Sequence, residues 1–232
     1  SAAPSPTASA TASATATATD GALAGWSLEE KVGQLMMVGV DATAPKDSST
    51  EAVDTHHVGN IFIAGRTTAG SQATQKVIAS FTGKVGPGTT HNTPMLVSTD
   101  QEGGDVQVLR GPGFSTIPSA LKQSEQAAAD LETAAAGWGG ELAQAGVTMN
   151  LAPVADIVDI ADPDSNEPIG AWGRQYGNDK ETVIERAGAF ARGMESAGVV
   201  ATFKHFPGLG RVVGNTDTSA SVTDAVTARS GD

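Results

Sequence analysis

The sequence contains no cysteine, which excludes disulfide bonds and thiolate metal sites. Basic residues are few, since 14 lysines and arginines stand against 26 acidic residues and give a formal net charge of −12. Nucleic acids and anionic membranes bind basic patches, so neither is expected as a partner. No apolar run reaches the roughly 18 residues that a transmembrane helix needs. Nucleophile-elbow, dinucleotide and Walker motifs are absent too, so no cofactor is expected. The composition fits a protein that acts on a neutral or small ligand.

Residues 1–20 consist almost wholly of Ser, Ala, Thr and Pro. Such a tract buries too little apolar surface to offset its ordering entropy, so residues 1–25 are predicted to be a disordered tether. Exported proteins often carry a spacer of this kind. We therefore expect an extracellular or cell-surface protein, with a lipid anchor upstream of residue 1 as one arrangement. A low-complexity tail without such a role is the alternative.

Residues 26–232 alternate apolar stretches of strand length with amphipathic helical patterns. Ser27-Leu28-Glu29-Glu30 has the spacing of a capping box, and Asp179 has the character of a second N-cap. Strands are expected at 35–40, 59–65, 95–100, 147–154 and 198–204, and helices after Ser27, at 69–82, at 122–145 and after Asp179. Apolar strands separated by helices indicate parallel β/α units. The predicted class is α/β, as an open parallel sheet or as five-eighths of a (β/α)₈ barrel.

Two acids follow the predicted third strand, in Asp100-Gln101-Glu102-Gly103-Gly104. A carboxylate at a strand end, followed by glycines that let the backbone approach a ligand, suits hydrogen bonding to sugar hydroxyls. For Asp100 the alternative is a helix N-cap and a tight turn. Glu102 could instead pair with the end of a neighbouring strand.

Lys204 and His205 close the last apolar strand and precede Pro207-Gly208. Ligands bind at the carboxyl ends of parallel strands, and lysine is seldom placed at the end of a buried strand without a partner. We therefore expect both side chains to face one cleft. A His205 satisfied within the core is the alternative. The other histidines, at positions 56, 57 and 91, are expected in surface loops.

Two further candidates lie in loops. Arg174 follows the fourth strand, either as a ligand-binding group or as a loop anchor with Asp156 and Asp159 available as its partners. The acids of this loop lack the spacing of a calcium site, so no metal site is predicted. Asp217 lies on a later loop, where a mobile carboxylate could donate a proton to a bound substrate. An ordinary exposed aspartate is the alternative there.

Together these segments resemble the family 3 glycoside hydrolases, in particular the bacterial β-N-acetylglucosaminidase (β-hexosaminidase) branch. The resemblance covers about residues 26–224 and rests on segments in the family's order: 100–104 with 117–119, 150–156, 173–177 and 204–210. It implies a (β/α)₈ barrel in which Asp100, Arg174, Lys204 and His205 bind the non-reducing sugar. It also implies cleavage of terminal β-linked N-acetylglucosamine with retention, through a covalent intermediate on an aspartate of a late barrel strand.

The sequence departs from the family pattern in two places. The family's nucleophile lies in a Thr-Asp segment well downstream of the fifth strand, and this sequence reaches Asp232 without one. We therefore expect a barrel truncated after about five β/α units and a 232-residue chain that is inactive alone. The branch also carries Asp-x-His on its mobile loop. Asp217-Thr218-Ser219 lacks that imidazole, so Asp217 is left as the candidate acid/base. Alternatives are a β-glucosidase of the same family and a non-catalytic sugar-binding remnant.

Overall fold

The computed structural model describes residues 21, 23–224 and 226. Most of the predicted tether, residues 1–20 and 22, lies outside them, and the described part forms a turn in which the Ala24 amide donates to the Gly21 carbonyl. No helix among the described residues is long and apolar enough to cross a membrane.

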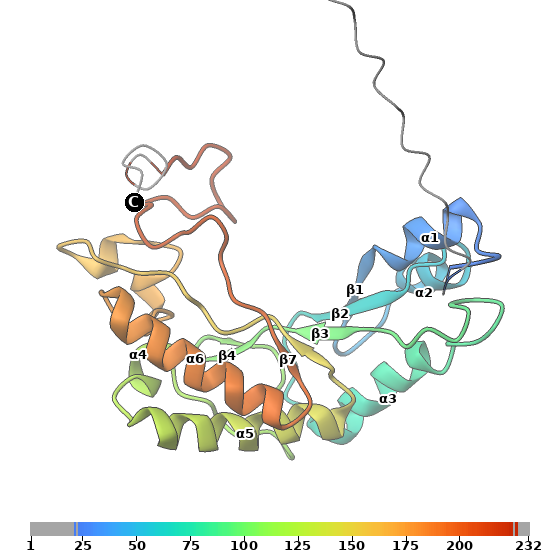
Figure 1. The fold of residues 1–232 in the computed structure, drawn as a ribbon, viewed down its shortest axis with the longest axis horizontal. Coiled ribbons are helices and arrows are strands. Elements are labelled where there is room, and N and C mark those ends of the chain that lie inside the picture. Colours follow the sequence, from blue (N-terminus) through green and yellow to red (C-terminus); the bar gives the residue numbers. More distant parts are fainter. Residues whose placement is uncertain (1–20, 22, 225, 227–232) are drawn as a thin grey trace, which may run out of the picture.

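Five parallel strands form the central sheet (Figure 1). Their order is β1-β2-β3-β6-β7, which follows the chain without reversal. A doubly wound sheet reverses its strand order, whereas a (β/α)₈ barrel does not. The parallel α/β class is confirmed, and the winding is of the barrel type. The strands are β1 Met37–Asp41, β2 Asn60–Ala64, β3 Val97–Thr99, β6 Met149–Asn150 and β7 Val200–Ala201.

Helices α3, α5 and α6 lie along one side of this sheet (Figure 1). The helices are α1 Leu28–Gln34, α2 Asp47–Asp54, α3 Ser71–Thr82, α4 Ala120–Gln123, α5 Ala128–Ala145 and α6 Lys180–Ser196. Two single-turn 3₁₀ helices, η1 Pro163–Ser165 and η2 Gly170–Trp172, lie in the loop after β6. Strands β4 Gln101–Gly103 and β5 Val106–Gln107 form a separate antiparallel hairpin.

The two predicted helix caps are confirmed. The Glu30 amide donates to Ser27 Oγ at 3.1 Å, and the Ser27 amide donates to Glu30 Oε2 at 2.7 Å, so each residue satisfies a free donor of the other. Asp179 Oδ1 accepts from the Thr182 amide at 2.8 Å and begins α6.

The helix expected at 122–145 is confirmed over residues 128–145 as α5, but its start at residue 122 is wrong, because the chain breaks between α4 and α5. Arg186 Nε donates to the Ser124 carbonyl at 3.2 Å, and the Ser124 hydroxyl donates to the Leu121 carbonyl at 2.7 Å. Ala127 is extended and forms the N-cap of α5. A contact from α6 therefore takes a carbonyl that a continuous helix would have used internally.

Other elements differ from expectation. Helix α2 and the β4–β5 hairpin were not anticipated, and strand β4 follows Asp100, where the alternative interpretation of Asp100 had a helix N-cap and a tight turn. The strand expected at 147–154 is paired in β6 and again at a single bridge between Val154 and Lys204. Pro153, which lies between them, has no amide hydrogen to donate to a ladder.

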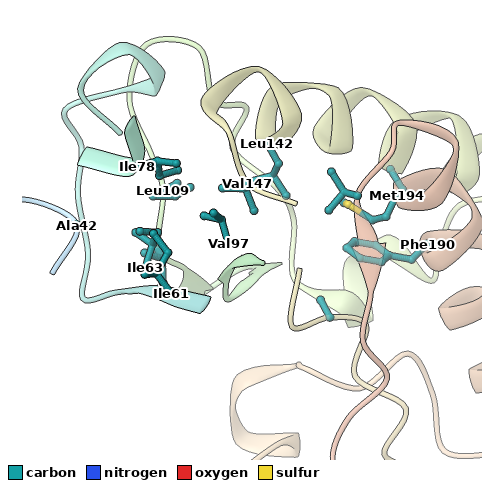
Figure 2. Close-up of a cluster of buried hydrophobic side chains, with 14 of the residues drawn as sticks. Ala42, Ile61, Ile63, Ile78, Val97, Leu109, Leu142, Val147, Phe190 and Met194 are labelled. Atoms are coloured by element: carbon teal, nitrogen blue, oxygen red, sulfur yellow. The ribbon is translucent and has the colours of Figure 1, made fainter. Parts of the chain in front are cut away.

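The core lies between the sheet and its helices (Figure 2). Ile61 and Ile63 of β2 and Val97 of β3 pack with Ile78 of α3 and Leu142 of α5, and all are almost fully buried. Phe190 and Met194 of α6 extend the same cluster. The helical stripes expected from the sequence thus face the core.

Helices α5 and α6 approach closely at Gly193. A Cβ added there would overlap the Glu132 carbonyl oxygen and lie 2.6 Å from the Ala135 Cβ. We expect Gly193→Ala to lower the free energy of unfolding by about 1–3 kcal/mol, because overpacking separates the helices. Gly137 of α5 is exposed with open space around it, so Gly137→Ala should stabilise by about 0.5–1 kcal/mol. Chemical denaturation measures the free energy of unfolding of both variants. Equal changes in that free energy for Gly193→Ala and Gly137→Ala would contradict this packing.

Candidate functional site

Parallel strands bring distant polar residues together at their carboxyl ends. Asp100 follows β3 directly, and Lys204 follows β7 and bridges to Val154. Lys204 Nζ lies 2.6 Å from Asp100 Oδ1 and 2.5 Å from Glu102 Oε1. The segments that leave β6 and β7 run side by side away from the sheet (Figure 1). One ammonium group therefore joins two carboxylates at this edge.

Glu102 is the more buried of the two acids that contact Lys204, with 4% of its side chain exposed against 27% for Asp100. Arg174 donates two hydrogen bonds to Glu102, from Nε to Oε2 at 2.9 Å and from Nη2 to Oε1 at 2.7 Å. Burial raises the pKa of Glu102, but the Arg174 hydrogen bonds and the Lys204 charge outweigh burial and hold it below its ordinary value. The group is thus a permanent carboxylate at neutral pH.

The Arg174 guanidinium is fixed on several sides. Burial lowers the pKa of Arg174, but its hydrogen bonds and charge interaction with Glu102 raise the pKa above the ordinary value. Its Nη1 donates to the Pro168 carbonyl at 2.8 Å, and its Nη2 lies 3.4 Å from His205 Nε2. A bidentate arginine held in this way has a fixed orientation.

His205 contacts a buried aspartate on its other side. His205 Nδ1 lies 2.6 Å from Asp156 Oδ2, and the side chain of Asp156 is 1% exposed. The same oxygen accepts from the His205 amide at 3.2 Å, and Asp156 Oδ1 accepts from the Leu209 amide at 2.6 Å. Asp156 thereby connects the segment after β6 to the segment after β7.

The buried side chains of Gln123 and Tyr176 form a hydrogen-bonded chain that ends at the Glu102 backbone. Gln123 Nε2 donates to the Glu102 carbonyl at 2.8 Å, and Gln123 Oε1 accepts from the Tyr176 hydroxyl at 2.9 Å. Burial, with the Glu102 charge, raises the pKa of Tyr176 well above its ordinary value, so the phenol remains a donor. These residues hold the site in place without belonging to it.

Asn166 joins the two loops that carry the site. Its Nδ2 donates to the carbonyls of Leu209 and Val212, and its Oδ1 accepts from the amides of Ile169 and Gly170. Neither this role nor that of Gln123 could be inferred from the sequence, because a single polar residue has no distinguishing pattern.

The partners suggested for Arg174 as a loop anchor are wrong. Asp156 contacts His205, and Asp159 forms hydrogen bonds of 2.9 and 2.7 Å with Arg211. Arg174 instead reaches Glu102, which the sequence suggested only as a residue that pairs with a neighbouring strand's end. The hairpin that begins at Gln101 turns Glu102 inward, and this hairpin was not foreseen.

The remaining candidates lie outside this cluster. Asp217 is exposed on the late loop, where its amide donates to Asn215 Oδ1 at 2.9 Å. His56 is exposed, as expected for a surface loop. His91 stacks on Trp26 with ring centroids 4.2 Å apart and contacts Glu30 at 3.0 Å, so it fastens the first helix to the loop before β3.

A cavity of about 490 Å³ opens beside Lys204 and His205. This volume lies in the range of small-molecule sites. The segments 155–157 and 203–211 form most of its wall, and Phe203 and Phe206 are among the lining residues. No cluster of acids and histidines among the described residues has the arrangement of a metal site.

The arrangement is suited to hydrogen bonding with a polyhydroxylated ligand. It offers carboxylate acceptors and cationic donors side by side, fixed by buried contacts. Comparison with known proteins then decides the family: residues 27–229 match the model of the glycosyl hydrolase family 3 N-terminal domain. The chain belongs to this family.

Several family 3 relatives are similar over most of the chain. The β-hexosaminidase LpqI of Mycobacterium tuberculosis is 34% identical over 200 residues, which are 85% of this chain and 47% of that protein. The crystal structure of a β-N-acetylhexosaminidase from Beutenbergia cavernae has 51% identity and a TM-score of 0.85, over 88% of this chain and 61% of that one. A β-N-acetylglucosaminidase from Paenibacillus has 35% identity and a TM-score of 0.70, over 82% and 35%. The chain spans about half the length of the LpqI relative it matches.

Proposed function

We propose that this family 3 domain forms the sugar-binding part of a retaining glycosidase that removes terminal β-linked N-acetylglucosamine. The observation that carries the proposal is the contact of one lysine with two carboxylates, beside an arginine and a histidine, at the carboxyl ends of parallel strands. The names of the similar proteins, β-hexosaminidase and β-N-acetylglucosaminidase, support the substrate class.

Each group of the cluster has a separate task in this proposal. Asp100 is 27% exposed and accepts hydrogen bonds from the hydroxyl groups of the sugar, while Lys204 and Arg174 donate to the oxygens of the ring substituents. Fixed donors and acceptors of this kind stabilise the transition state when their hydrogen bonds strengthen as an oxocarbenium ion develops. This binding energy acts at the reacting carbon only if the sugar is held rigidly, and the buried partners of Arg174 and His205 provide that rigidity.

Glu102 is not the proton donor in this proposal. Its pKa lies below the ordinary value, because the Arg174 hydrogen bonds and the Lys204 charge outweigh burial, so it carries no proton at neutral pH. Asp217, exposed on its loop, remains the candidate acid/base. Both acids beside Lys204 are paired with cations, which favours binding without cleavage as the second candidate for the 232-residue chain alone.

A chimera tests the proposed activity. Residues 27–224 replace the matching part of the Beutenbergia cavernae enzyme, to which this chain is 51% identical. We expect the folded chimera to release the chromophore from an aryl β-N-acetylglucosaminide much faster than from an aryl β-glucoside. A folded chimera that prefers the glucoside would support the β-glucosidase alternative and contradict the proposal.

The 232-residue chain by itself is expected to show no turnover above blank with the same aryl β-N-acetylglucosaminide. The reason is the absence from this sequence of the family's downstream Thr-Asp nucleophile segment, without which no glycosyl-enzyme forms. Chromophore release is followed with purified chain and with heat-denatured chain as the control. Turnover that is clear above blank would refute this expectation.

A further inference from the structure

Asp156 and His205 form a pair whose geometry fixes one proton. Asp156 Oδ2 lies 2.6 Å from His205 Nδ1, and the Asp156 carboxylate is buried. Both of its oxygens also accept backbone amides, from His205 itself and from Leu209. The carboxylate can only accept, so His205 Nδ1 must carry the hydrogen.

The opposite nitrogen of His205 faces a donor. Arg174 Nη2 lies 3.4 Å from His205 Nε2, and a guanidinium nitrogen has hydrogen atoms to donate and no lone pair to accept with. A hydrogen on Nε2 would point at that cation. Arg174 is held by Glu102 and the Pro168 carbonyl, so it has little freedom to turn away. The two neighbours therefore select the same state of the ring from opposite sides.

We propose that Asp156 is a positioning residue that locks His205 in its neutral Nδ1–H tautomer and leaves Nε2 as an acceptor. Free histidine prefers the other tautomer, so the selection comes from the site. His205 lines the cavity, and the lone pair on Nε2 can accept from one donor on that side, either Arg174 Nη2 at 3.4 Å or a ligand hydroxyl that takes its place, while Nε2 has no hydrogen to donate to a ligand oxygen that can only accept. The hydrogen bond from a sugar hydroxyl to Nε2 rests on the function proposed above, whereas the tautomer of His205 does not.

Nitrogen NMR of the 232-residue chain labelled at histidine tests the tautomer without any sugar. The chain has only four histidines, so the His205 signals are assigned as those missing from His205→Asn. At pH 8 we expect a pyrrole-type shift for Nδ1 and a pyridine-type shift for Nε2. The opposite assignment, or two pyrrole-type nitrogens of an imidazolium, would overturn the proposal.

Two variants separate positioning from mere packing. Asp156→Leu removes the acceptor and should move His205 toward the Nε2–H tautomer, while the same change at Asp159, an acid of the same loop that contacts Arg211, should leave the tautomer unchanged. If Asp156→Leu folds with the wild-type tautomer, the proposal is wrong. The wild-type spectrum decides the question if that variant does not fold.

His205→Asn supplies the ligand-side readout. Its amide nitrogen can still donate to Asp156, so the thermal midpoint should stay close to that of the wild type. It lacks the Nε2 acceptor, so the affinity for N-acetylglucosamine in calorimetry should fall about tenfold or more. Unchanged affinity with the expected tautomer would overturn the hydroxyl-reading role. A wild-type chain with the expected tautomer that binds no sugar would instead contradict the proposed function.

Discussion

Glu102→Gln is expected to lower the free energy of unfolding at neutral pH by about 3 kcal/mol, because removing one member of a buried ion pair leaves the others uncompensated. The substitution removes the charge that Arg174 and Lys204 both contact. Arg174 is 17% exposed and Lys204 is 15% exposed, so water relieves their desolvation only in part. Urea denaturation monitored by circular dichroism measures the loss.

The pH dependence of this effect has a definite sign. Burial raises the pKa of Glu102, but Arg174 and Lys204 outweigh it, so the pKa is lower in the folded chain than the value of 4.5 expected when unfolded. The stability contributed by its ionisation is therefore fully present above pH 4.5 and is lost as the pH falls through the folded pKa. The difference in the free energy of unfolding between wild type and Glu102→Gln should therefore become smaller as the pH is lowered.

Glu125→Gln is the matched control. Glu125 pairs with Lys122 at 2.8 Å, but its side chain is 63% exposed, and exposed pairs contribute about 0–1 kcal/mol. Two results would show that Glu102 is not the paired carboxylate described here. One is a loss of unfolding free energy for Glu102→Gln no larger than that for Glu125→Gln. The other is a difference in unfolding free energy between wild type and Glu102→Gln that widens as the pH falls.

Lys204→Met is expected to weaken binding of N-acetylglucosamine about a hundredfold or more. The substitution removes a donor to the sugar and leaves Asp100 and Glu102 without the cation between them. Hydrogen bonds to charged groups contribute about 1.5–3 kcal/mol each, and the freed carboxylates would repel one another. Isothermal titration calorimetry measures the affinity, with circular dichroism to establish that the variant is folded.

Lys180→Met provides the comparison for this prediction. Lys180 begins α6, its side chain is 72% exposed, and its nearest acid is Glu181 at 3.7 Å. Its removal changes the net charge by the same amount without touching the cluster. If both variants bound the sugar as tightly as the wild type, Lys204 would have no part in recognition.

Much of the fold could be predicted from local patterns. The capping box at Ser27 and the cap at Asp179 depend on residues three apart, so the sequence contains all the information they need. The break between α4 and α5 could not be predicted, because Arg186, a residue of a later helix, takes the Ser124 carbonyl. Element boundaries depend on such tertiary contacts more than on propensity.

The site also combines features that the sequence predicts with features that depend on tertiary contacts. Asp100 and Lys204 could be placed at one edge because each follows a parallel strand, and such strands align their carboxyl ends. The partner of Arg174 could not be found in this way. Glu102 reaches Arg174 through an unforeseen hairpin, while the acids nearest in sequence are occupied by His205 and Arg211.

The central claim is that the cluster around Lys204 binds a sugar, and a crystal structure of the chain with N-acetylglucosamine tests it most directly. We expect sugar hydroxyls within about 3.2 Å of Asp100 and Lys204, with the ring beside His205. Density for the sugar at another place on the molecule, with the cluster untouched, would contradict the account.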